Sequence, residues 1–139
     1  MGNAIDLFDS FSTDQQTEEE GKLTQLPDCG DTLWLVARSG NKSYNKLLSN
    51  LYKRNRAVLD SKGDEAQKKS DEILAEVFAK TILLGWQGEV MYKKKLTPYS
   101  YEAAKLLLGH KDFRAKVAAV AEDFSTFKTV EESLDLPNS

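Results

Sequence analysis

The sequence DEAQKKSDEILAEVFAKTILLG, residues 64–85, has the longest regular pattern of the chain. Its apolar side chains recur at intervals of three and four residues, which places them on one face of a helix: Ile73, Leu74, Val77, Phe78 and Ile82. Gly85 provides a stop after this run. We therefore expect a long helix from about Asp64 to Leu84, at the centre of the molecule.

Three further stretches have helical spacing. The first follows Asn41 or Ser43, either of which can cap a helix by accepting from a free backbone amide. Its apolar face comprises Tyr44, Leu47, Leu48, Leu51 and Tyr52. Another helix is expected after Ser100, ending at Gly109. The last begins near Lys111 and has the clearest period: Phe113, Val117, Val120, Ala121, Phe124 and Phe127.

Two segments between these helices favour extended structure. Residues 22–38 contain two short extended stretches separated by Pro27, Asp28 and Gly30, so we expect a hairpin there. Residues 86–99 can form a short hairpin or an ordered loop. The predicted fold class is therefore mainly α: a compact four-helix domain with a minor N-terminal β-hairpin.

The charge is distributed unevenly along the chain. Residues 1–31 hold eight acids against Lys22 alone and carry −7, so the remainder carries +4 because the net charge is −3. We expect residues 1–21 to be a mobile acidic arm, 22–134 a helical domain and 135–139 a frayed tail. Apolar residues interleave with the acids of the arm, at Ile5, Leu7, Phe8 and Phe11. Such a pattern can mark a binding segment, although a solubilising tail is the commoner interpretation.

The residues that could carry chemistry are few and far apart. Cys29 and His110 are the only cysteine and histidine, which is too poor a set for a structural zinc site. The carboxylates lie in polar stretches, where nothing would raise a pKa for acid–base catalysis. We therefore expect no enzymatic activity, no catalytic residue, no metal and no cofactor. No apolar run approaches the roughly 20 residues of a membrane-spanning helix, so a cytoplasmic location is expected.

Basic residues along the first helix and at Lys93, Lys94 and Lys95 raise the alternative of a small nucleic-acid-binding regulator. The pI near 5.3 disfavours it, because such proteins are usually basic overall. Aromatic residues are better candidates for partner contact, since they bury much area at small entropic cost. The predicted partner-binding residues are four aromatic residues and one leucine that follows Tyr44 by one helical turn: Tyr44, Leu48, Trp86, Tyr92 and Tyr99.

Three stretches, taken in order, resemble the tail assembly chaperone family of long, non-contractile phage tails. They are ARSGNKSY (37–44), LLGWQG (83–88) and LTPYS (96–100), the last leading into the 106–108 leucine run. The resemblance covers about residues 32–128. Lys93, Lys94 and Lys95 depart from it, since relatives tend to carry an acidic, glycine-containing turn there.

The resemblance implies a protein that binds the long helical tape measure protein, keeps it soluble and helps recruit tail tube subunits. It implies no cofactor, allows self-association, and places the protein in the host cytoplasm and outside the mature virion. A structural tail component retained in the virion is the alternative within this class. The family commonly makes a longer product by ribosomal slippage, and Leu136, Pro137 and Asn138 can be encoded by a slippery C-CCA-AAY heptamer.

Overall fold

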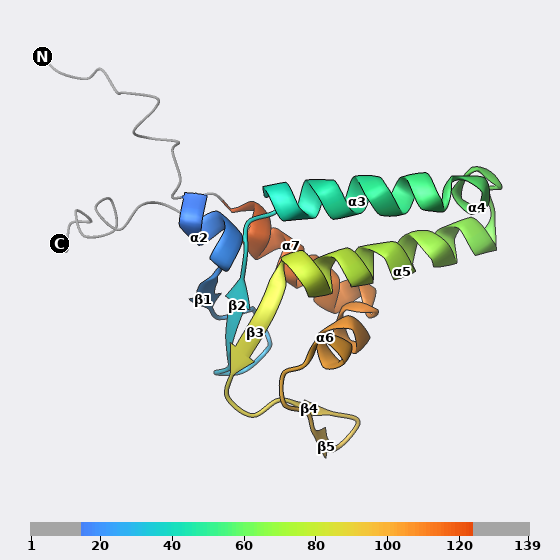
Figure 1. Cartoon of the computed structure of the whole chain (residues 1–139). Helices are drawn as coiled ribbons and strands as arrows, with labels where there is room; N and C mark the ends of the chain where they lie inside the picture. Colours follow the sequence, from blue (N-terminus) through green and yellow to red (C-terminus); the bar gives the residue numbers. More distant parts are fainter. Residues whose placement is uncertain (1–14, 124–139) are drawn as a thin grey trace, which may run out of the picture.

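The computed structural model describes residues 15–123, and their side chains from Glu18 onward. Within this range the chain forms six helices and five strands (Figure 1). The helices are α2 (Gln15–Glu20), α3 (Lys42–Arg54), α4 (Arg56–Asp60), α5 (Asp64–Thr81), α6 (Tyr101–Leu108) and α7 (Lys111–Glu122). The strands are β1 (Lys22–Thr24), β2 (Leu33–Val36), β3 (Leu83–Gln87), β4 (Met91–Tyr92) and β5 (Lys95–Leu96).

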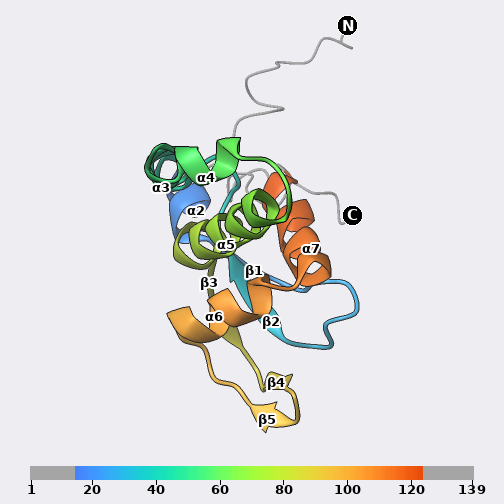
Figure 2. The same cartoon turned by 90° about the vertical axis from the view of Figure 1, so that its right-hand side faces the viewer.

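Three of the strands form an antiparallel sheet in the order β1-β2-β3. The middle strand β2 alternates half-buried and buried side chains, which turns Trp34 and Val36 toward the core. Trp34 lies opposite Trp86 of β3, and the register shifts between Leu35 and Val36. Strands β4 and β5 form a separate hairpin, and in both views this hairpin and α2 lie at opposite ends of the sheet (Figures 1 and 2).

Helices α3 and α5 run side by side as a helical hairpin that extends away from the sheet, with α4 at its far end (Figure 1). Asn41 caps α3: its Oδ1 accepts from the Tyr44 amide at 2.9 Å, and its side-chain amide donates to the Arg38 and Thr81 carbonyls. Ser100 caps α6 by accepting from the Ala103 amide at 3.0 Å. Both caps agree with the sequence prediction.

The buried apolar residues form two clusters. The main core joins the sheet, the C-terminal part of α5, α6 and α7, and contains Leu26, Trp34, Val36, Ala75, Phe78, Ala79, Ile82, Leu83, Ala104, Leu107, Leu108, Val117 and Ala121. The distal core joins α3 to α5 in the helical hairpin and has three buried members: Leu51, Ile73 and Val77. Tyr44 packs against both cores and connects them.

The predicted four-helix domain is wrong, because the described residues combine helices with two small antiparallel sheets. The expected hairpin over residues 22–38 forms as β1 and β2, but β3 extends it to three strands. The central helix ends at Thr81 rather than Leu84, since Leu83 and its neighbours pair with β2 instead of continuing the helix. Pairing with a distant strand has overridden local helical spacing here.

Two short helices were not expected. Helix α4 follows α3 directly, and α2 occupies residues 15–20 of the segment for which a mobile arm was predicted. The Glu19 carboxylate accepts from the Lys42 amide and from the Ser43 hydroxyl, both at 3.2 Å, so α2 is joined to the start of α3. The predictions for the arm before residue 15, for Phe124 and Phe127, and for the C-terminal tail lie outside the described residues.

Candidate partner-binding surfaces

The first two predicted partner-binding residues lie on the face of α3 that packs against α5. Tyr44 is partly buried, and its ring meets that of Phe78 edge to face at a centroid distance of 6.0 Å. Leu48 is also partly buried and packs against the distal core. Burial raises the pKa of the Tyr44 hydroxyl above its ordinary value. Both side chains thus contribute to packing within the chain.

Trp86 and Tyr99 lie together near the C-terminal end of β3. Trp86 is half-buried, and its ring centroid lies 5.3 Å from that of Trp34 and 5.1 Å from that of Tyr99. The Tyr99 ring meets the Trp86 ring edge to face. Tyr99 is 40% exposed, and partial burial raises its pKa. Among the described residues, the buried indole Nε1 atoms of Trp34 and Trp86 have no hydrogen-bond partner. Tyr99 is therefore the more accessible of the two predicted residues at this position.

Tyr92 attaches the β4–β5 hairpin to the turn between α6 and α7. Its hydroxyl lies 2.6 Å from Nε2 of His110, and the two ring centroids are 5.6 Å apart. Which atom donates depends on the histidine tautomer. The structure therefore brings Trp86 together with Tyr99, places Tyr92 in a separate contact with His110, and leaves Tyr44 and Leu48 on α3.

The most exposed apolar pair of the described chain was not among the predicted partner-binding residues. Met91 and Leu96 lie opposite each other on β4 and β5 and are 59% and 58% exposed. The turn between them has positive φ at Lys93 (51°) and Lys94 (68°), as in the tight turns of two-residue hairpins. We call Met91 and Leu96, which share one face of the hairpin, the hairpin surface; Lys95 pairs with Tyr92 and lies on the other face. The signal of the hairpin surface in the sequence was two apolar residues flanking a lysine run.

A groove runs along one face of α5 beside the end of α6. It has a volume of about 530 Å³ and is lined by residues from the two helices and the turn that follows: Asp64, Gln67, Lys68, Asp71, Glu72, Ala75, Lys105, Leu106 and Gly109. Leu106 is 52% exposed. We call this feature the α5–α6 groove. The groove was not predicted, because it depends on how α5 and α6 pack against each other, which no local pattern in the sequence contains.

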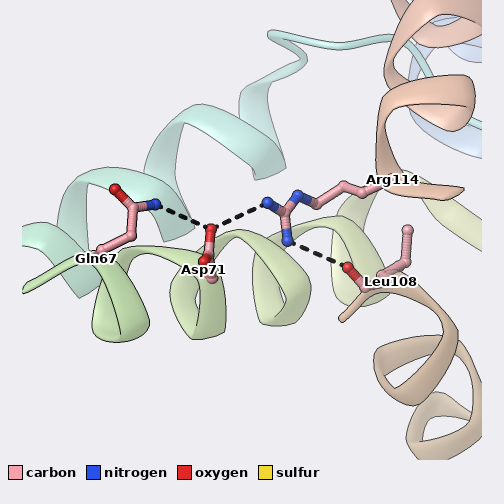
Figure 3. Close-up of polar contacts among 4 residues, drawn as sticks. All are labelled: Gln67, Asp71, Leu108 and Arg114. Carbon is pink, nitrogen blue, oxygen red and sulfur yellow. Dashed lines mark hydrogen bonds and ion pairs between the residues drawn. The ribbon is translucent and has the colours of Figure 1, made fainter. Parts of the chain in front are cut away.

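The side of the groove formed by α5 is fixed by a polar network (Figure 3). Arg114 Nη2 donates to Oδ1 of Asp71 at 3.1 Å, and Nη1 donates to the Leu108 carbonyl at 3.2 Å. Gln67 Nε2 donates to the same Asp71 oxygen at 3.3 Å. The Arg114 side chain is only 11% exposed, so this ion pair is partly desolvated. The network connects α5 to the end of α6 and to α7.

Residues 15–123 contain no group of three or more histidine, cysteine or acidic residues that could hold a metal ion. Burial raises the pKa of the Cys29 thiol, which disfavours the reactive thiolate. In the same range no helix is both long and apolar enough to cross a membrane.

A family model described as YdaY prophage protein matches residues 39–136. No curated protein and no solved structure matches the chain. The matched residues run from the turn before α3 through α7, and so include the α5–α6 groove and the hairpin surface. Because this family model matches most of the sequence, the chain belongs to the YdaY prophage protein family and is phage-derived.

Proposed function

We propose that this prophage protein is a non-enzymatic tail assembly chaperone that binds an amphipathic helix of a tape measure protein in the α5–α6 groove. In this role it keeps the tape measure protein soluble and helps recruit tail tube subunits. The proposal combines phage origin, the resemblance of residues 32–128 to such chaperones, and one structural observation. That observation is the uncovered face of α5.

The uncovered face follows from the unequal lengths of two packed helices. The 18 residues of α5 span about 27 Å, whereas the eight residues of α6 span about 12 Å. Helix α6 therefore covers only the part of α5 nearest the sheet (Figure 1). The groove residues Asp64, Lys68 and Asp71 recur at three- and four-residue spacing along the remainder. The open strip thus follows the axis of α5.

The chemistry of the groove suits an amphipathic helix. Leu106, which is 52% exposed, offers apolar contact, whereas Lys68, Lys105 and Glu72 offer both signs of charge at the sides. A partner with one apolar stripe flanked by mixed charges can satisfy both, which is the usual mode of helix-in-groove recognition.

Co-expression of the full chain with helical segments of the phage's tape measure protein tests the proposal. A Leu106→Ser variant should weaken binding by about tenfold, because an apolar anchor commonly contributes more than 1 kcal/mol to an interface. Leu23→Ser is the matched control, since Leu23 is also an exposed leucine and lies on β1. If both variants lose the same amount of binding, or if neither loses any, the groove is not the binding site.

Purified mature particles decide between two roles in tail assembly. A chaperone should be absent from them by mass spectrometry, although present in infected cells. A structural tail component would be found there in stoichiometric amounts, and this result would overturn the chaperone proposal.

A further inference from the structure

We propose that the N-terminal segment of this chain, residues 1–14, binds along the outer face of α3 in the same molecule and covers the basic side chains there. The outer face is the side of α3 that points away from α5. This inference goes beyond the proposed function, because it requires no tape measure protein and uses neither the α5–α6 groove nor the hairpin surface.

The outer face of α3 carries a row of exposed cations. Lys42, Lys46, Ser49 and Lys53 recur at four- and three-residue spacing, so their side chains share one face of the helix. The apolar residues of α3 that pack against α5 lie on the opposite face. Arg56, the first residue of α4, lines one groove together with Ser49 and Lys53 and so continues the row. We call these five exposed residues the basic stripe.

The positive charge of the basic stripe is uncompensated. Helix α3 contains no aspartate or glutamate. Among residues 15–123, none of the four cations of the stripe takes part in an ion pair. Like charges one helical turn apart, as at Lys42 and Lys46, repel each other. An anionic segment along this face would therefore stabilise the helix.

An apolar hollow lies at the far end of the stripe. A groove of about 390 Å³ is lined by residues of α3 and α4: Ser49, Tyr52, Lys53, Arg56, Leu59 and Asp60. Tyr52 is 37% exposed, and Leu59 is partly buried beside it in the same groove. Asp60 is the one acid among the lining residues. The occupant of the stripe should thus be acidic and should also carry large apolar side chains.

The N-terminal segment has this composition. It contains three acids, Asp6, Asp9 and Asp14, and no lysine or arginine. Phe8 and Phe11 lie between these acids and can supply the ring that the groove accommodates. The C-terminal stretch after residue 123 is a weaker match, because Lys128 lies between its phenylalanines and its acids. Charge complementarity therefore favours the N-terminal segment.

The segment is tethered at the right end of α3. Helix α2 is joined to the start of α3 by the two hydrogen bonds of the Glu19 carboxylate, and Gln15 lies about 6 Å from Glu19 along α2 (Figure 1). Residue 8 can extend roughly 25 Å from Gln15. Lys53 lies about 17 Å from Lys42 along the helix, so the segment can follow the whole stripe.

The short tether makes weak contacts sufficient. Exposed ion pairs are individually weak, but a segment held by a short linker has an effective concentration in the millimolar range. The segment would then occupy the stripe in preference to polyanions from outside the molecule. Its role would be to shield α3 from nucleic acids and other acidic surfaces of the host.

A spin label in the N-terminal segment tests the contact in the full-length chain. The nitroxide is attached at Ser10→Cys, with Cys29→Ser to leave a single thiol, and the line broadening of amide signals is measured by NMR. Broadening should be strong at Ser49, Lys53 and Arg56 and absent from the β4–β5 hairpin. Equal broadening in both regions, or none in α3, would overturn the proposal.

Charge variants of the labelled chain show whether the stripe holds the segment. Lys46→Gln with Lys53→Gln should reduce the broadening in α3 severalfold. The matched control, Lys94→Gln with Lys95→Gln, makes the same change in net charge on the β4–β5 hairpin and should leave the broadening unchanged. Equal effects of the two variants would contradict a specific contact with the stripe.

Mixing a spin-labelled chain with an unlabelled, 15N-enriched chain separates contacts within and between molecules. Since the contact lies within one molecule, the enriched chain should show no broadening at α3. Broadening in the mixture would mean that the segment binds another copy, which would overturn the proposal.

A short DNA duplex serves as a probe for uncovered positive charge. At low salt, Asp6→Asn with Asp9→Asn and Asp14→Asn should bind the duplex about tenfold more tightly than wild type, as measured by fluorescence anisotropy. Adding Lys46→Gln and Lys53→Gln should remove this gain, and so should salt, because charges are screened beyond about 10 Å at 0.1 M. Unchanged affinity, or a gain on neutralising Glu131 and Glu132 instead, would contradict the proposal. Leu106→Ser should alter neither readout, which separates this test from that of the α5–α6 groove.

Discussion

The main core and the distal core differ in size although one helix, α5, belongs to both. Thirteen buried residues from the sheet and three helices form the main core, whereas three residues from α3 and α5 form the distal core. Stability within a protein varies with such local burial. The end of the helical hairpin should therefore open far more often than the sheet. Since the first turns of α5 form one side of the α5–α6 groove, the proposed binding site for the tape measure protein lies in the less stable region.

Truncating one leucine in each core tests this difference and should give the largest effect. Leu108 is fully buried in the main core, and Leu108→Ala should lower the free energy of unfolding by about 3–5 kcal/mol. Leu51 is 7% exposed in the distal core, and Leu51→Ala should chiefly speed amide exchange in α3, α4 and the first half of α5. Urea unfolding measures the free energy of unfolding, and hydrogen exchange measures the local opening. Equal global losses would mean that the cores unfold as one unit.

Removing the ion pair between the two regions should have the next largest effect. Arg114→Ala leaves the partly buried Asp71 carboxylate and the Leu108 carbonyl without this donor, at a cost of about 2 kcal/mol. Lys116→Ala is a matched control on the same helix, because its partner Asp28 is 87% exposed and the loss should stay below about 1 kcal/mol. Thermal unfolding compares the two variants. Similar losses would show that the network in Figure 3 does not hold α5 to α7.

A substitution outside both cores should not change the difference in local stability between the main core and the distal core. Lys94 has a φ of 68°, a left-handed conformation that disfavours residues other than glycine. Lys94→Gly relieves this strain and should raise stability by about 0.5 kcal/mol after the added freedom of the unfolded chain is counted. Lys95→Gly, at a strand position without positive φ, should lower it instead. Denaturation curves that shift in the same direction would contradict the turn geometry.

The smallest effect concerns pH and the residue that connects the cores. Burial, mainly, raises the pKa of Tyr44 in the folded state above its unfolded value near 10. The corresponding stabilisation is complete below about pH 10 and is lost as pH rises through the folded pKa. Tyr44→Phe should therefore reduce the loss of stability as the pH rises above about 10, as urea unfolding would measure. An unchanged pH profile would contradict a buried, protonated Tyr44 hydroxyl in the folded state.

Local signals in the sequence were sufficient for several parts of this fold. Ser100 was predicted as a cap, and Asn41 as one of two candidates beside Ser43, because short polar side chains before apolar periods have a direct local role. The turn chemistry of residues 27–30 likewise predicted the β1–β2 hairpin. Strand β3 was missed because Leu83 and Leu84 continue the helical spacing of α5, and only pairing with β2 makes them extended.

The candidate surfaces depended on information that no local pattern contains. Trp86 was expected to contact a partner, but Trp34 packs against it from the neighbouring strand. The α5–α6 groove exists because α6 ends at Leu108 while α5 continues, a relation between two helices rather than a property of either. The exposure of Met91 and Leu96 likewise follows from the position of their hairpin outside both cores.

The central place of β2 in the sheet has a consequence for synthesis on the ribosome. Its first partner, β1, leaves the ribosome before it, but its second partner, β3, follows only after all of α3, α4 and α5. At about 5–20 residues per second, these roughly 50 residues take roughly 3–10 s to translate. During that interval β2 presents an unpaired edge on which nascent chains can pair with one another. The yield of native protein should therefore depend on translation speed through α5, and slow codons there should increase aggregation even though the finished protein is unchanged.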